Sequence, residues 1–224
     1  MNTPNILPVI AVVGPFRSGT SCVAGTLHNL GISMGLKFIK SAKFNLKGTF
    51  EAQWLQKICK ECYEEPNMIE REPKSSRVAK LREWAIGRTK QLAIGSLIGA
   101  KHPTLCLMVE DMVEAWPQVR IISVDRPIEE SVESGLRTGW LPTAEQIIPK
   151  MVEIRDTVIA ATKVPTLRVS YHNLLDNPRS VIYQMINFCG ISPNKREVDF
   201  AVHFVDPALC HHDETKSGGR NVAS

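Results

Sequence analysis

Residues 9–21 read Val-Ile-Ala-Val-Val-Gly-Pro-Phe-Arg-Ser-Gly-Thr-Ser, and this stretch decides the fold class. Its first five residues form an apolar, mostly β-branched run of the kind that is buried on both faces of a parallel sheet. The run ends at Gly14, and a turn with a second glycine, Gly19, leads into a helix expected over 22–30. A strand, a glycine-rich turn and a helix in this order are what a phosphate-binding loop requires.

The remainder of the chain repeats this alternation of short strands and longer helices. The expected strands are 97–101, 119–124 and 166–169, and the expected helices are 50–64, 76–92, 104–116, one opened by Pro127, 143–162 and 177–189. Helices of this length between strands imply crossover connections and a parallel sheet covered on both faces. The sequence therefore predicts a three-layer α/β/α P-loop fold with a central parallel sheet. We expect one domain over 1–224, whose residues from about 207 form a C-terminal loop and tail.

Composition narrows the classes of function. The chain has 224 residues, of which 43% are hydrophobic and 22% charged, as is typical of a globular domain. Its net charge of +4 suits a small anionic ligand, and without a concentrated basic patch it does not indicate a nucleic acid partner. No apolar run approaches the length of a membrane span, and no basic segment precedes the first apolar stretch. We therefore expect no membrane partner, no signal peptide and a cytoplasmic location.

The predicted phosphate loop carries its cation in an unusual place. Successive backbone N–H groups and the positive end of the following helix would bind an anion, and the hydroxyls of Thr20 and Ser21 can donate hydrogen bonds. The Gly-x4-Gly spacing matches the Walker A pattern, but Thr20 stands where ATPases and GTPases need lysine. Arg17 supplies a cation earlier in the loop instead. This arrangement argues against nucleoside triphosphate chemistry and favours a donor with a shorter anionic chain.

Two segments resemble the PAPS-dependent sulfotransferase family, whose donor is 3′-phosphoadenosine 5′-phosphosulfate. Residues 15–21 resemble the family's 5′-phosphosulfate loop, and the segment from Val124 to Ser134 resembles its 3′-phosphate segment, in which an arginine ends a strand and a serine follows. Proline directly follows Arg126 here, whereas the family usually has one residue between the arginine and the proline. This difference leaves the register of the serine open, and Ser131, one helical turn before Ser134, is the alternative. Weaker similarities at 47–51, 101–106 and 169–178 extend the resemblance to other family segments.

The resemblance implies a set of site residues and a cofactor. The residues expected to bind the donor are Pro15, Arg17, Ser18, Gly19, Thr20, Ser21, Arg126 and Ser134. PAPS is the expected co-substrate, PAP the product, and no metal is required because the donor has no triphosphate to bridge. Arg17 is expected on the leaving 5′-phosphate oxygen and the sulfuryl group. A guanidinium fork such as that of Arg126 matches a nearly dianionic phosphate, although a surface ion pair with Glu129 or Glu130 is the alternative.

The acceptor must lose a proton, so a general base is expected. Glu51 is the first candidate, because it follows the basic loop at a helix start where family members carry a glutamate. His102 is the second, at the end of the strand 97–101, and the ordinary pKa of histidine suits the role. Lys101, beside His102, is expected to help bind the sulfuryl oxygens. Trp54, one turn beyond Glu51, is either an acceptor-pocket or adenine-stacking residue or part of the core.

Two other classes of function fit the same sequence. Asp125 resembles a Walker B carboxylate, which would indicate a kinase that uses Mg²⁺, and a non-catalytic nucleotide-binding protein could share the same fold. Cys59 and Cys62 could form a zinc site with the Cys210-His211-His212 segment, or be reduced thiols.

The acceptor is expected to be a small molecule or a saccharide. The basic residues Lys37, Lys40, Lys43 and Lys47 hint at a polar or anionic one, and a solvated basic face is the alternative.

Overall fold

A parallel sheet is the centre of the computed structural model, which describes residues 5–39 and 47–207. The four strands lie in the order β4-β1-β5-β6, and every neighbouring pair is parallel. Their bounds are β1 Val9–Val13, β4 Ile98–Lys101, β5 Val119–Asp125 and β6 Thr166–Ser170. All five residues of β1 are buried, as expected for a strand with covered faces on both sides.

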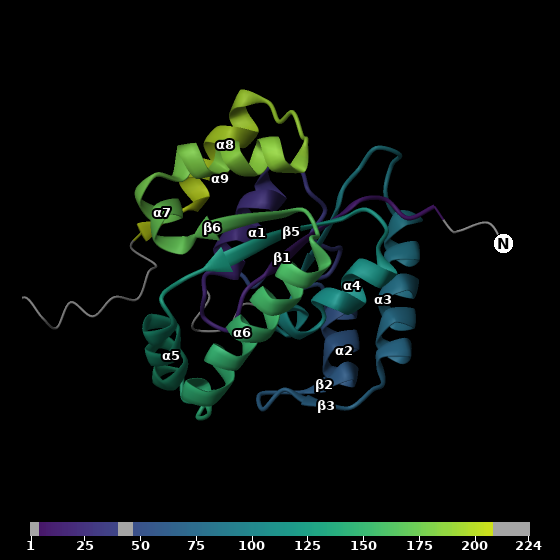
Figure 1. Ribbon diagram of the computed structural model, residues 1–224. Helices are drawn as coiled ribbons and strands as arrows, with labels where there is room; N and C mark the ends of the chain where they lie inside the picture. The colour runs from purple at the N-terminus through teal and green to yellow at the C-terminus, as the bar shows by residue number, and fades with distance from the viewer. Residues whose placement is uncertain (1–4, 40–46, 208–224) are drawn as a thin grey trace, which may run out of the picture.

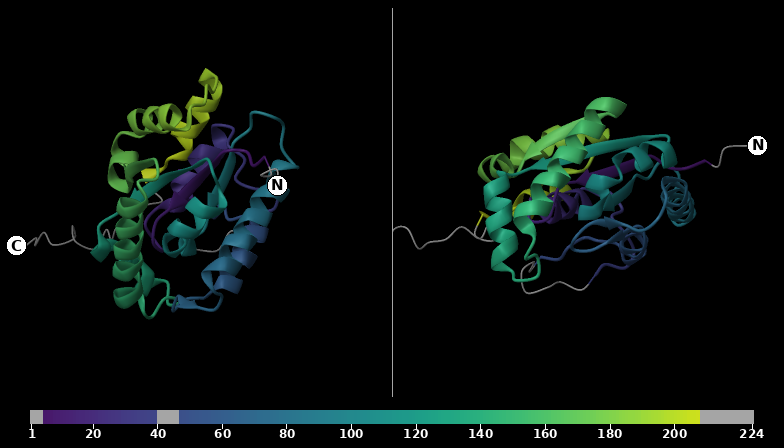
Figure 2. Two further views of the ribbon diagram at one scale, coloured as in Figure 1. Left: turned by 45° about the vertical axis from the view of Figure 1, so that its right-hand side comes forward. Right: turned by 60° about the horizontal axis from the view of Figure 1, so that its bottom comes forward.

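Helices cover both faces of this sheet (Figures 1 and 2). The helices are α1 Thr20–Asn29, α2 Gln53–Cys62, α3 Lys74–Thr89, α4 Val109–Ala115, α5 Ile128–Arg137, α6 Ala144–Thr162, α7 Tyr171–Asp176, α8 Pro178–Cys189 and α9 Lys195–Phe204. Alternate residues of β1 point to opposite faces of the sheet and belong to two separate hydrophobic clusters. Val9, Ala11 and Val13 pack with α2, α3, α4 and α6, whereas Ile10 and Val12 pack with α1, α7, α8 and α9. The predicted three-layer α/β/α architecture with a central parallel sheet is confirmed.

Several parts of the described chain differ from the sequence prediction. The helix expected from residue 50 begins at Gln53, so Glu51 precedes it, and the helix α7, Tyr171–Asp176, was not predicted. The helix expected over 104–116 is a 3-10 helix, η1 Pro103–Leu107, followed by α4, because Met108 between them leaves helical geometry with ψ 19°. A two-stranded hairpin, β2 Tyr63–Glu64 and β3 Ile69–Glu70, ends α2 earlier than expected. The helix α9 was not foreseen, although Asn194 and Glu197 form a capping box at its start.

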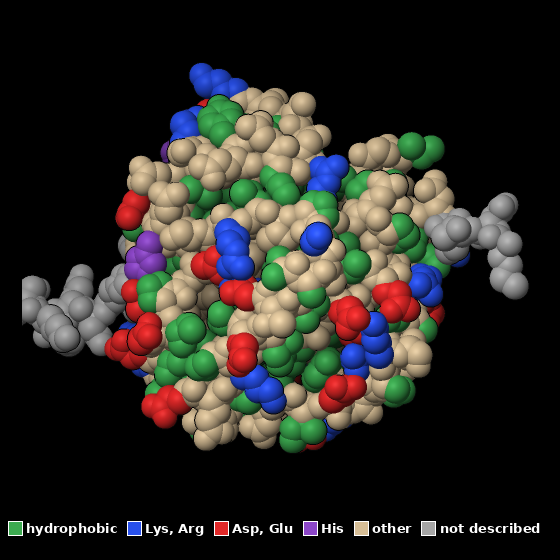
Figure 3. Space-filling model, viewed as in Figure 1, with side chains coloured by type: hydrophobic (Ala, Val, Ile, Leu, Met, Phe, Trp, Pro, Cys, Tyr) green, Lys and Arg blue, Asp and Glu red, His purple; other side chains and the backbone are tan. Residues whose placement is uncertain are grey.

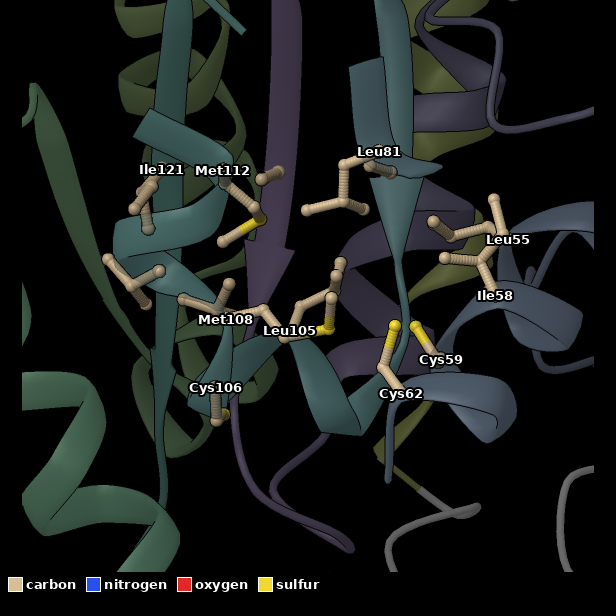
Figure 4. Packing of buried hydrophobic residues seen from close by; sticks show 14 of the residues in the cluster. Leu55, Ile58, Cys59, Cys62, Leu81, Leu105, Cys106, Met108, Met112 and Ile121 are labelled. Carbon is tan, nitrogen blue, oxygen red and sulfur yellow. The ribbon is translucent and has the colours of Figure 1, made fainter. Parts of the chain in front are cut away.

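The cysteine pair of α2 lies in the apolar core. Cys59 and Cys62 are both fully buried, and Figure 4 shows them among Leu55, Ile58 and Leu81. Burial raises the pKa of the Cys59 thiol well above its usual range and that of Cys62 to about 11, so both are held as thiols. Within residues 5–39 and 47–207, no group of three His, Cys, Asp or Glu side chains is arranged to hold a metal ion. The Cys210-His211-His212 segment lies outside the described residues.

The surface mixes charges of both signs. On the face shown in Figure 3, Lys and Arg side chains are interspersed with Asp and Glu and separated by apolar atoms. Many charged side chains of the described surface are paired, as Lys74 is with Glu110 at 2.8 Å. No helix in the described part of the chain is both long enough and apolar enough to cross a membrane.

Candidate active site

The loop between β1 and α1 folds back tightly on itself. Its Ser18 is buried, and the Ser18 hydroxyl donates a hydrogen bond to the carbonyl of Pro15 at 2.8 Å. A Cβ on Gly14 would lie only 2.5 Å from that hydroxyl oxygen, which is why glycine is needed there. Arg17 and Gly19 have φ values of 66° and 92°, in the left-handed region. The turn is therefore present as predicted and leads directly into α1, whose first backbone N–H groups have no intrahelical partner.

Arg17 and two residues from the β5–α5 segment converge beside this loop. Arg17 Nε donates to the hydroxyl of Ser134 at 3.0 Å, across 117 residues of sequence. Arg126 follows β5, and its Nη1 donates to the carbonyl oxygen of Arg17 at 3.1 Å. Burial lowers the pKa of Arg17, and the nearby charge of Arg126 lowers it further. Such a pair favours an anion between or beside them.

Arg126 also has a carboxylate partner. Its Nε donates to Glu130 Oε2 at 3.0 Å, and His172 Nε2 lies 2.9 Å from the same oxygen. The ion pair with Glu130, which was the alternative for Arg126, is therefore present. The Arg126 side chain is only 8% exposed, however, so the pair lies in the site and is not a solvated surface pair. Burial disfavours the charge on Glu130, but the hydrogen bonds from Arg126 and His172 outweigh it and lower the pKa of that carboxyl.

Tyr171 was not among the predicted site residues, yet its ring lies against the loop. The Arg126 guanidinium is 5.5 Å from the centre of this ring. A Cβ on Gly19 would come within 2.2 Å of the same ring. Two signals in the sequence could have found it. Tyr171 lies within the segment 169–178 that resembles the sulfotransferase family, and it directly follows β6, where residues at the carboxyl ends of parallel strands meet at one edge.

The two candidate serines of α5 have different surroundings. Both are buried, at 1% exposure for Ser131 and 4% for Ser134. Ser134 contacts Arg17, whereas the Ser131 hydroxyl has no hydrogen-bond partner among the described residues. A buried hydroxyl without a partner requires an explanation, such as a ligand atom. The geometry therefore brings Ser134 to the loop and leaves Ser131 available beside it.

A second cluster forms where β4 ends. Lys101 is 3% exposed, and its Nζ donates to Glu51 Oε1 at 2.5 Å and to the Ser21 hydroxyl at 3.2 Å. The lysine thus joins the loop between β1 and α1 to the first candidate base. Burial raises the pKa of Glu51, but the charge of Lys101 and its hydrogen bond outweigh this effect and hold that pKa below its usual value. Glu51 is therefore a carboxylate at neutral pH.

His102 lies deeper than Glu51. Its Nε2 is 3.8 Å from Glu51 Oε2 and 3.5 Å from Oε1 of Glu65, and its side chain is 2% exposed against 13% for Glu51. Burial lowers the pKa of His102 despite the two carboxylates, so the imidazole is neutral at pH 7. Both candidate bases therefore belong to one cluster, with Glu51 nearer to solvent.

Several solved structures with a similar arrangement of strands and helices are sulfotransferases. The sulfotransferase domain of the Synechococcus olefin synthase superposes with a TM-score of 0.60 at 17% identity, covering 100% of this chain and 92% of that one. Sulfotransferase STF9 of Mycobacterium avium matches at TM-score 0.62 and 11% identity, over 93% and 70% of the two chains. The sulfotransferase domain of the curacin biosynthetic pathway matches at 0.56 and 15%, over 96% and 81%. No family model and no curated protein sequence matches.

The chain has the sulfotransferase fold. At 11–17% identity the likeness establishes the fold alone, and the chemistry has to be argued from the residues that the fold brings together.

Other predicted residues lie away from these clusters of the sulfotransferase fold. One edge of Trp54 packs against α3, where a Cβ on Gly87 would come within 2.3 Å of the indole, but the side chain is 39% exposed and is not part of the core. Lys47 pairs with Asp206 at 3.3 Å and donates to the carbonyl of Phe204. Lys37 is exposed, and Lys40 and Lys43 lie outside the described residues.

The Walker B-like carboxylate is already neutralised. Asp125 accepts hydrogen bonds from Arg155 Nη2 at 2.7 Å and from Arg168 Nη1 at 3.2 Å. The Arg155 side chain is 2% exposed and also binds the carbonyl of Val124. A carboxylate held between two guanidinium groups is a poor ligand for Mg²⁺. Asp125, the residue that best supported the kinase hypothesis, instead binds two arginine side chains of the fold.

Proposed function

We propose that this chain is a PAPS-dependent sulfotransferase that moves a sulfuryl group to a hydroxyl or amine of a small-molecule or saccharide acceptor. One observation carries the proposal. Cations from two separate strand ends, Arg17 and Arg126, meet at a phosphate loop that lacks the Walker lysine, and Ser134 joins them. A bis-phosphorylated nucleoside with a sulfate at one end presents the anionic groups that such a site would bind.

The residues divide between the two ends of the donor. Arg126 with Ser134, or Ser131, is suited to the 3′-phosphate, because both serines lie on the helix that follows Arg126. The amino end of α1, with Thr20 and Ser21, is suited to the 5′-phosphate. Arg17 lies between these groups, and we assign it to the leaving phosphate oxygen and the sulfuryl group.

The transfer itself needs positioning and charge stabilisation more than covalent chemistry. Glu51 takes the proton from the acceptor hydroxyl or amine, and the acceptor atom forms a bond to sulfur on one side. On the opposite side the bond from sulfur to the 5′-phosphate oxygen breaks, and PAP leaves with the electron pair. Arg17 and Lys101 stabilise the negative charge that develops on the leaving oxygen and the sulfuryl oxygens. None of these steps requires a metal ion.

The two rival hypotheses make different demands on the same site. A kinase would need a lysine where Thr20 stands and a free carboxylate where Asp125 is bound to two arginines. A non-catalytic nucleotide-binding protein would keep the donor residues but would have no use for a carboxylate held beside the phosphate loop. The contact of Lys101 with both Ser21 and Glu51 therefore favours an enzyme.

Calorimetry with PAP tests the proposal directly. We expect PAP to bind in the presence of EDTA, and Mg·ATP to bind at least about tenfold more weakly, a difference of about 1.4 kcal/mol. Turnover is then followed with isotopically labelled PAPS and a panel of phenols, amines and saccharides. Tighter binding of Mg·ATP would favour the kinase. PAP binding without transfer to any acceptor or to water would favour the non-catalytic protein.

A further inference from the structure

The β2–β3 hairpin carries a carboxylate that no sequence motif singled out. Glu65 lies in the turn of this hairpin, and its side chain is 19% exposed. Its Oε1 is 3.5 Å from Nε2 of His102 and accepts a hydrogen bond from the hydroxyl of Thr104 at 3.0 Å. Glu65 thus reaches the base cluster from an element remote from the phosphate loop.

Thr104 completes the contacts around His102. Its backbone N–H donates to His102 Nδ1 at 3.4 Å, and its hydroxyl oxygen lies 3.1 Å from the same nitrogen. When Nδ1 accepts a hydrogen bond, the proton of a neutral imidazole is on Nε2. That N–H then faces the carboxylates of Glu51 and Glu65. Polar groups therefore face both nitrogens of the buried ring, and Glu65 is involved on each side. Its Oε1 lies 3.5 Å from Nε2, and it accepts a hydrogen bond from Thr104, which contacts Nδ1.

An arginine of α3 anchors the hairpin that carries Glu65. Its ladder has only two residue pairs, and a two-stranded hairpin of this size is marginal alone. Arg77 of α3 ties it down by pairing with Glu70 of the hairpin and with Asp111 of α4. The same guanidinium lies 5.5 Å from the ring centre of Tyr63. A largely buried arginine therefore fixes the hairpin to two helices, and with it the place of Glu65.

We propose that Glu65 is a positioning residue, which holds His102 with its Nε2–H facing Glu51 and so orients the base. The inference rests on the proposed function, because Glu51 acts as a base only if the chain transfers sulfuryl groups. Glu65 itself touches no reacting atom in this scheme. Glu65 acts on the base only by way of the His102 imidazole. The tautomer and orientation of that ring are therefore the most direct measure of the role of Glu65.

The variant Glu65→Gln tests this idea with little change in shape. The amide oxygen can still accept from Thr104, but the negative charge beside Nε2 is lost. Glu64→Gln is the matched control, because Glu64 is on the same hairpin and pairs with Arg71 at 2.8 Å on the surface. Thr104→Val is a second variant, which breaks the bridge and leaves every charge in place.

Three measurements are made on each variant of the full chain. The first is the affinity for PAP by calorimetry, the second the rate of PAPS conversion to PAP with water as the acceptor, and the third the ¹⁵N NMR resonances of the His102 ring. We expect Glu65→Gln and Thr104→Val to leave PAP affinity within about twofold, to lower kcat at least about tenfold with KM for PAPS unchanged, and to shift the His102 resonances. Glu64→Gln should change none of these.

The outcomes separate this inference from the proposed function. If the unmodified chain does not bind PAP, the proposed function fails, and the His102 resonances still decide whether Glu65 positions the ring. If PAP binds but the His102 resonances and kcat of Glu65→Gln match those of Glu64→Gln, the positioning role is wrong and the proposed function stands. A rise in KM for PAPS with unchanged kcat would also overturn it, because it would place Glu65 in donor binding.

Discussion

Replacement of Arg126 by methionine should weaken binding of PAP selectively. The substitution keeps an apolar stem of similar length and removes the guanidinium, whose Nη1 lies 3.1 Å from the carbonyl oxygen of Arg17. Under the proposed function this group binds the 3′-phosphate, which PAP has and AMP lacks. The difference between the two ligands therefore isolates the contribution of Arg126 to the 3′-phosphate from any general damage to the loop.

The expected size of the effect follows from the surroundings of Arg126. A hydrogen bond to a charged group contributes about 1.5–3 kcal/mol, which corresponds to about 10- to 150-fold in Kd. The full Coulomb attraction of two unit charges at 4 Å, about 4 kcal/mol near a protein surface, is an upper limit. It is not reached because Glu130, at 3.0 Å from Arg126 Nε, already neutralises part of the charge in the free protein.

Calorimetry on the original chain and on Arg126→Met, each with PAP and with AMP, provides the assay. We expect Kd for PAP to rise about 10- to 150-fold and Kd for AMP to change less than about twofold. Arg120→Met is the control, because Arg120 is near the start of the same strand and its Nη1 binds the carbonyl of Phe188 at 3.0 Å. It should leave both affinities unchanged.

Two results would refute this reasoning. An unchanged Kd for PAP would mean that Arg126 serves only its ion pair with Glu130. Equal losses for PAP and AMP would mean that it acts by supporting the loop through the Arg17 carbonyl, and that the 3′-phosphate binds elsewhere.

Three further changes test other parts of the site and fold. Lys101→Met should move the acid limb of the pH–rate profile to higher pH. Without the charge of Lys101, burial raises the pKa of Glu51, so a higher pH is needed to form its carboxylate; an unmoved limb would exclude Glu51 as the base. Gly19→Ala should weaken PAP binding at least about tenfold in calorimetry. A Cβ there comes within 2.2 Å of the Tyr171 ring, and a non-glycine residue at φ 92° costs about 1–2 kcal/mol, so the loop has to shift; unchanged affinity would place the anion outside the loop. Arg77→Met should lower the free energy of unfolding by about 3–5 kcal/mol in urea titrations, because Asp111 is left buried without its cation; a loss under 1 kcal/mol would contradict this.

The sequence predicted the parts of the fold that local pattern controls. The apolar run of β1 and the glycines that follow it specify a strand and a tight turn almost without tertiary context, and both are present. Lys101 and Arg126 could be placed at the same edge of the sheet because parallel strands end together. The β2–β3 hairpin was missed because residues 63–70 have no alternating pattern, and Arg77 and other tertiary contacts hold it in place.

The contacts within the site could not be predicted in the same way. The bond between Arg17 and Ser134 depends on the left-handed conformation of Arg17, at φ 66°, which few non-glycine residues adopt and which no sequence pattern reveals. Glu65 reaches His102 only because the hairpin is fixed to α3 and α4. Spacing indicates which residues reach the sheet edge, whereas the pairing among them is decided by loop geometry and by packing distant in sequence.

The strand order assigns a direction to the proposed donor. β1 lies between β4 and β5, so the predicted phosphate loop that follows β1 has Lys101 on one side and Arg126 on the other. If Arg126 takes the 3′-phosphate, the sulfate end of the donor points toward β4, where Lys101 contacts Glu51. The acceptor must then approach over the carboxyl end of β4, because an in-line attack on sulfur comes from the side opposite the leaving phosphate. A donor bound in the reverse direction would place the sulfuryl group beside Arg126, where Glu130 is already occupied by two partners and no second carboxylate of the described residues contacts that arginine.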